Sequence, residues 1–124
     1  MSQQVSMTRT VVYTLSAQDA EEINKRRNDW FDEVTRIRQV ARETGEPPEF
    51  IGYQAHAGNP ANEGDEFPAV VVRVNAGGTV NLRVTLDGTD DLWATSRAEA
   101  PLDLDKDGNE TIGSPGRWHW PTRV

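Results

Sequence analysis

Residues 67–96 read FPAVVVRVNAGGTVNLRVTLDGTDDLWATS, and this stretch decides the fold. From 80 to 86 an apolar residue stands at every second position, which is the period of a strand with one buried face. Glycine-containing turns at 76–78 and 87–90 divide the stretch into three short strands. The side chains expected on the buried face are Val80, Leu82, Val84 and Leu86. Short strands joined by such tight turns predict an antiparallel sheet.

A fourth strand is expected at 117–120, where two tryptophans alternate with a histidine. Four short strands of this kind predict a small curled sheet or an SH3-like barrel. The predicted organisation is an N-terminal arm or strand (1–15), a long helix (16–45), a linker loop (46–66) and a small β-barrel (67–124). The fold class is therefore α+β, with one long N-terminal α-helix followed by a small antiparallel β-barrel or sheet.

The long helix carries clear start and stop signals. Ser16 is a good N-cap, and acidic residues follow it at the positive end of the helix dipole. No Gly or Pro interrupts 17–43, and Gly45 followed by two prolines ends the helix.

The apolar residues of this helix form a narrow seam at steps of three and four, which Arg27 interrupts. Such a stripe can lie on the protein's own sheet, or it can pair with a partner helix across a subunit boundary. The sequence leaves both alternatives open. The candidate interface residues are Ile23, Arg27, Trp30, Val34 and Ile37.

Composition argues against several classes of protein. The 124 residues contain no cysteine and carry a net charge of -7. Residues 44–124 hold six basic and thirteen acidic residues, so this part is a poor partner for a phosphate backbone. No apolar run approaches the ~20 residues that a membrane helix needs. The N-terminal stretch also lacks the apolar segment of a secretory signal. A membrane is therefore not an expected partner, and the acidic charge argues against nucleic acid as one.

Catalytic motifs are weak. The chain has two histidines, no G-x-S-x-G nucleophile context and no phosphate-binding glycine loop. Paired acids for hydrolysis could be sought at 87–91, but aspartates are ordinary turn residues. The chain is therefore predicted not to be an enzyme.

Ligand binding is better supported. Tryptophans anchor interfaces and stack on planar ligands. One or two of them can instead close the barrel core, and Trp93 is expected to do so. The loops at 56–59 and 87–90 are polar and contain glycine, and they can share a ligand only if both lie at the same end of the barrel. The candidate ligand-binding residues are His56, Asn59, Asp87, Asp90, Trp93, Trp118 and Trp120.

One segment has the spacing of a calcium loop. Asp103, Asp105 and Asp107, followed by Gly108, match the first half of an EF-hand loop. Ser114 stands at the twelfth position, where that loop needs a bidentate Glu. The expectation is therefore a solvated hairpin tip and no cofactor, with Ca²⁺ at the three aspartates as the alternative.

Several segments together resemble a family of small proteins of tailed bacteriophages, mainly actinobacterial phages. The resemblance covers most of the chain except 28–50 and 98–114, so it implies no metal. The segments that carry it are YTLSAQDAEEINKRR (13–27), AHAGN (55–59), EGDEFPAVVVRV (63–74), VNLRVTLDGTDDLWATS (80–96) and WHWPTRV (118–124).

This resemblance implies a phage context and no known activity. The expected function is that of a non-enzymatic virion structural protein, such as a capsid decoration, cement or minor head–tail protein. Its partners would be other virion subunits or further copies of itself, and it would be found in the virion and, during assembly, in the host cytoplasm. The alternative is a host-interaction protein that sequesters a small molecule such as a nucleotide signal.

Overall fold

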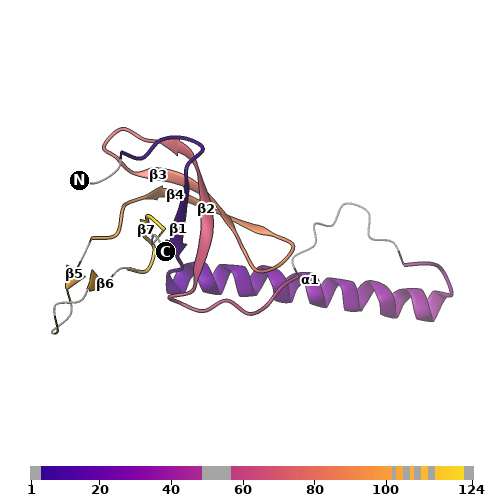
Figure 1. Cartoon of the computed structure of the whole chain (residues 1–124). Helices are drawn as coiled ribbons and strands as arrows, with labels where there is room; N and C mark the ends of the chain where they lie inside the picture. Colours follow the sequence, from indigo (N-terminus) through magenta and orange to yellow (C-terminus); the bar gives the residue numbers. More distant parts are fainter. Residues whose placement is uncertain are drawn as a thin grey trace.

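The computed structural model describes residues 4–48, 57–101, 103–104, 107, 110–111 and 114–121. It contains one long helix, α1, and a mainly antiparallel β region (Figure 1). The elements in chain order are β1 (Thr10–Thr14), α1 (Ala17–Thr44), β2 (Glu66–Val74), β3 (Val80–Thr85), β4 (Asp91–Arg97), β5 (Asp103–Leu104), β6 (Glu110–Thr111) and β7 (Trp118–His119). The predicted α+β class is confirmed.

Helix α1 begins and ends where its local signals predict. Ser16 is the N-cap, and its hydroxyl accepts a hydrogen bond from the backbone N–H of Asp19. The Asp19 carboxylate accepts in return from the Ser16 N–H at 3.0 Å, which completes a capping box. At the other end Gly45 adopts φ 75°, and its N–H donates to the Ala41 carbonyl. Both ends of the 28-residue helix therefore have their free backbone groups partly satisfied.

The main sheet has five strands in the order β4-β3-β2-β1-β7 (Figure 1). All of its strand pairs are antiparallel, and β1 lies between β2 and β7. The N-terminal arm or strand is thus an inner strand of the sheet. The short strands β5 and β6 pair with each other in a separate ribbon.

The sheet is open, so the SH3-like barrel expected from the sequence is not confirmed. Its two edges are β4 and β7, and β7 pairs with β1 at only two positions, Val12 and Tyr13. A single bridge between Glu99 and Trp118 brings the chain after β4 beside β7. Within the described residues this bridge does not continue into a strand pair, so the two edges are not joined into a ladder.

The core lies on one face of this sheet. Val80, Leu82, Val84 and Leu86 are buried as predicted, and Arg83 and Thr85 between them are exposed. From β1 and the turn after it come Val11, Tyr13 and Leu15. Helix α1 adds only Ala20 and Ile23 to this cluster.

The first half of α1 lies at one end of the sheet strands, and its second half projects past the sheet (Figure 1). All four buried residues of α1, Asp19, Ala20, Ile23 and Arg27, are in the first half. No residue from Asn28 to Thr44 is buried, and we call this segment the distal half of α1. Among the described residues, no helix combines the length and apolar character that crossing a membrane requires.

Candidate binding site

Two of the predicted ligand loops meet at one end of the sheet. Gly58 and Gly88 form an antiparallel bridge, and the Thr89 N–H donates to the Ala57 carbonyl at 2.7 Å. The Asn59 side-chain amide donates to a carboxylate oxygen of Asp87 at 2.6 Å. The condition set by the sequence, that both loops lie at the same end, is therefore met for the described part of these loops.

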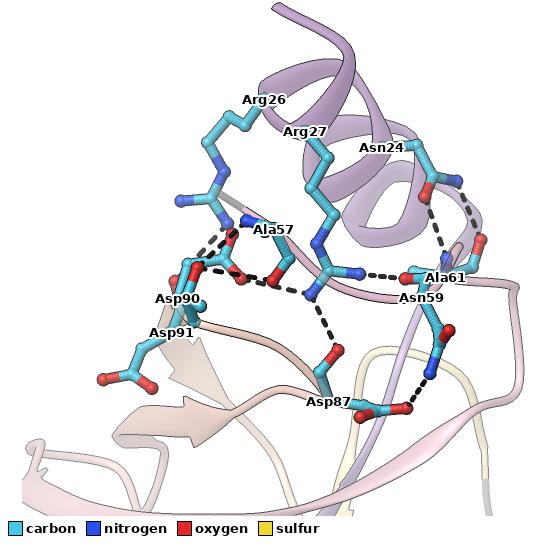
Figure 2. Close-up of polar contacts among 10 residues, drawn as sticks. Asn24, Arg26, Arg27, Ala57, Asn59, Ala61, Asp87, Asp90 and Asp91 are labelled. Carbon is cyan, nitrogen blue, oxygen red and sulfur yellow. Dashed lines mark hydrogen bonds and ion pairs between the residues drawn. The ribbon is translucent and has the colours of Figure 1, made fainter. Parts of the chain in front are cut away.

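The Arg27 side chain lies between these loops (Figure 2). It donates to the backbone carbonyls of Asn59 and Asp87. It also forms an ion pair with Asp90, with Nη2 and Oδ1 3.1 Å apart. The side chains of Arg27 and Asp90 are only 9% and 1% exposed, so this is a buried, charge-assisted contact.

The two glycines are required by this close packing. A Cβ on Gly58 would lie 2.7 Å from Nη2 of Arg27, and one on Gly88 would lie 2.8 Å from the same atom. Each added Cβ would also collide with a backbone carbonyl of the opposite loop. We call the cluster of Arg27, Asn59, Asp87 and Asp90 with these two glycines the Arg27 latch.

Two neighbours of Arg27 extend the contact between α1 and the loops (Figure 2). The Asn24 amide donates to the Ala61 carbonyl and accepts from the Ala61 N–H, both at 2.8 Å. Arg26 donates to the Asp91 carbonyl at 3.4 Å. The polar groups of the loops are therefore largely bonded within the chain, as expected of a structural junction.

A second buried cluster connects β1, α1 and β4. The Tyr13 hydroxyl donates to a carboxylate oxygen of Asp19 at 2.5 Å, and the other oxygen lies 3.4 Å from Nη2 of Arg97. Burial, and then the hydrogen bond to Asp19, raise the pKa of Tyr13 well above its ordinary value. The tyrosine is therefore a persistent hydrogen-bond donor at neutral pH.

Replacing Tyr13 with Phe is expected to lower the free energy of unfolding by about 1.5–2 kcal/mol at neutral pH, since a hydrogen bond to a charged group is lost. The folded-state pKa of Tyr13 is raised above its unfolded value of about 10, so its contribution is complete below that pH and is lost as the pH rises. Urea unfolding at neutral and alkaline pH should show the gap between wild type and Tyr13→Phe narrowing. The exposed change Thr10→Ala on the same strand should leave the pH dependence unaltered, and a constant gap would contradict the assignment.

The three candidate tryptophans do not form one stacking platform. Trp118 is buried in the core and contacts Trp120 edge to face, with ring centroids 5.5 Å apart. Trp93 is 47% exposed on β4, beneath the Arg83 guanidinium, so the expectation that it closes the core is wrong. Trp93 points away from the core, since its neighbours Leu92 and Ala94 are buried, whereas Trp118 lies in the core. His56, the remaining member of the predicted set, lies outside the described residues.

The calcium-like segment is described only in part. Asp103 lies in β5 and Asp107 is an exposed turn residue, while Asp105 lies outside the described residues. Among the residues that the structure describes, no group of three His, Asp or Glu side chains is placed to hold a metal.

The predicted helix seam divides into two parts. Ile23 and Arg27 face the protein's own core and loops, whereas Trp30, Val34 and Ile37 on the distal half of α1 are only half-buried. Beside this seam, Phe31 is 65% exposed and Val40 is 45% exposed. The first alternative left open by the sequence, packing on the protein's own fold, therefore holds for Ile23 and Arg27. The second alternative, pairing with a partner helix, stays a prediction for the distal half.

An open hollow lies near the end of the distal half of α1. It has a volume of about 600 Å³ and is lined by Arg38, Ala41, Arg42, Glu46 and Pro48. A smaller hollow of about 240 Å³ lies where the helix leaves the Arg27 latch, and its lining includes Trp30, Phe31 and Gly58.

Sequence reasoning missed Asn24 and the Tyr13–Asp19 pair, and it placed Gly58 and Gly88 in ligand loops without predicting their contact with Arg27. The signal that could have found the latch was Arg27 itself, because a charged residue within an apolar seam needs a buried partner. No protein-family model matches the chain, and no curated protein or solved structure matches it significantly. The site is therefore interpreted from its own geometry.

Proposed function

We propose that this chain is a non-enzymatic binding protein that attaches to other protein subunits through the distal half of α1. The observation that carries the proposal is the half-buried seam of Trp30, Val34 and Ile37 with the exposed Phe31 beside it. In keeping with the phage resemblance, we assign it to the virion as a capsid decoration, cement or minor head–tail protein.

The apolar side chains that the distal half of α1 leaves unburied support a partner at this segment. Most of the stability of a helix in a protein comes from packing its apolar face, not from intrinsic helix propensity. No side chain of the distal half of α1 is buried, although this segment carries a Trp, a Phe, an Ile and two Val. Aromatic residues that are exposed in this way are typical of the anchors of protein interfaces.

The closed form of the Arg27 latch supports a binding role over a catalytic one. The aspartates that could serve as paired acids are Asp87, Asp90 and Asp91. Asp87 accepts from Asn59, and Asp90 is buried against Arg27. Two of the three carboxylates thus serve the junction between α1 and the loops, and Asp91 is exposed beside them.

Replacing Trp30 and Ile37 together with Ala is expected to abolish attachment while the sheet stays folded, because neither side chain is part of the core. The measurement is the amount of the chain in purified phage particles, quantified by mass spectrometry. The matched control is Asp32→Ala with Gln39→Ala, two exposed changes on the opposite helix face, which should leave the amount unchanged. Equal incorporation of the two double variants would refute the proposed surface.

A second candidate function is small-molecule sequestration in the hollow beside the latch, which offers the indole of Trp30 and the ring of Phe31 for stacking. Its volume of about 240 Å³ is below the range of about 300–1,000 Å³ usual for ligand pockets. Native mass spectrometry of gently purified protein separates the two functions. An adduct lost on denaturation would favour sequestration, whereas its absence would favour subunit binding.

A further inference from the structure

We infer that the distal half of α1 binds the same segment of a second copy, in an antiparallel pair about a two-fold axis. This inference rests on the proposed function and names the partner of the proposed surface. A two-fold interface has to be self-complementary, so the two ends of the segment must fit each other.

The seam has this self-complementarity in size. Its distal members, Trp30, Val34, Ile37 and Ala41, follow one another at steps of four, three and four residues. In an antiparallel pair centred between 35 and 36, Trp30 of each copy faces Ala41 of the other, and Val34 faces Ile37. The largest side chain thus meets the smallest, and the two of middle size meet each other.

The hollow near the end of the helix provides a place for the aromatic residues. It lies at Ala41, between Arg38 and Arg42 of the helix and Glu46 and Pro48 of the segment that follows it. In the antiparallel pair, Trp30 and Phe31 of the second copy arrive at this position. Guanidinium groups stack favourably on aromatic rings, so the two arginines suit the chemistry of these side chains as well as their size.

The position of the Arg27 latch favours antiparallel over parallel pairing. The latch loops cover the seam face at Arg27, directly before the distal half begins. Parallel helices would bring the two sets of loops against each other and would place Trp30 opposite Trp30 and Ala41 opposite Ala41. Antiparallel helices place each set of loops beyond the end of the partner seam, so no such collision arises.

The contact is short. With a rise of 1.5 Å per residue, the seam from Trp30 to Ala41 spans roughly 17 Å. Interfaces of this size belong to the small, reversible class. We therefore expect a dimer that dissociates on dilution.

Sedimentation velocity over a micromolar-to-millimolar concentration series tests the pairing. The wild-type chain should change from monomer to dimer as its concentration rises. The Ala41→Trp variant, in which the new side chain fills the hollow, should remain a monomer throughout. The matched control is Gln39→Trp, which adds the same side chain on an exposed face of the same helix and should still dimerise. Circular dichroism confirms that each variant is folded. A wild-type monomer at every concentration, or equal dimerisation of the two Trp variants, would overturn the inference.

Disulfide trapping tests the direction of the helices, and the absence of native cysteine makes the readout clean. Val34→Cys mixed with Ile37→Cys should give a disulfide-linked heterodimer, because these positions face each other only in the antiparallel pair. Each variant alone should cross-link poorly, since its two thiols are offset along the axis. Rapid cross-linking of Val34→Cys with itself would indicate parallel helices and overturn the arrangement.

Failure of the self-pairing can be distinguished from failure of the proposed function. A chain that is always monomeric but enters particles through Trp30 and Ile37 overturns the self-pairing alone. A chain that neither dimerises nor depends on these residues for incorporation overturns both.

Discussion

Replacing Arg27 with Ala is expected to lower the free energy of unfolding by about 3–5 kcal/mol, because it removes one partner of a buried, hydrogen-bonded ion pair. The ion pair that is lost is the one with the Asp90 carboxylate, whose side chain is 1% exposed. The Asn59 and Asp87 carbonyls lose a donor in the same substitution. The loss is a large part of the total stability of a domain of this size, about 5–15 kcal/mol.

Urea unfolding followed by circular dichroism measures this loss, and the neighbouring arginine supplies a matched control. Arg26 makes one long hydrogen bond to the Asp91 carbonyl, so Arg26→Ala should cost about 1 kcal/mol or less. Arg27→Lys should rescue little, because one ammonium cannot reproduce the geometry by which a guanidinium contacts both loops. Similar losses for Arg26→Ala and Arg27→Ala would show that the latch does not secure α1 to the sheet.

Those parts of the fold that depend on neighbours in sequence could be predicted. The Ser16 capping box and the Gly45 stop are local hydrogen-bonding arrangements, so the bounds of α1 follow from a few adjacent residues. The alternation from Val80 to Leu86 likewise identifies the buried face of β3, because the period of a strand is two.

Pairings between distant segments could not be predicted in this way. Nothing near β1 specifies that it lies between β2 and β7, and nothing near Trp118 limits β7 to two residues. An open sheet and a closed barrel can be built from the same alternating strands, and long-range pairing at the edges decides between them.

The candidate site shows the same limit. The seam at steps of three and four is a property of α1 alone, and apart from Arg27 it continues from Ile23 to Ala41. The loops at 57–61 and 86–91 bury the first part of the seam and leave the second part half-buried. Which part they contact depends on tertiary structure. Arg27 marks the boundary in the sequence, but its partner Asp90 is 63 residues away.

Replacing Gly88 with Ala is expected to cost about 3 kcal/mol, at the upper end of the range for overpacking a well-packed site. The added methyl group would lie 2.8 Å from Nη2 of Arg27 and 2.9 Å from the Gly58 Cα, and it would also meet the Ala57 carbonyl. A flexible side-chain end could move aside, but two of these three neighbours are backbone, so the bridge itself has to open. The Thr89-to-Ala57 hydrogen bond is then lost as well.

The matched comparison for Gly88→Ala is Gly45→Ala, where φ is 75° but no atom lies within 4 Å of the added Cβ. There the cost is the left-handed backbone alone, about 1–2 kcal/mol, so urea unfolding should rank Gly88→Ala as the more damaging change.

Gly58→Ala should lower the free energy of unfolding by about as much as Gly88→Ala. The double variant should lose less than the sum of the two single losses, because both substitutions open the same bridge. Additive losses would mean that the glycines act separately and that the latch is not one cooperative contact. Gly88→Ala combined with Arg27→Ala should cost little more than Arg27→Ala alone, because the loop contacts that Gly88→Ala disrupts are already weakened.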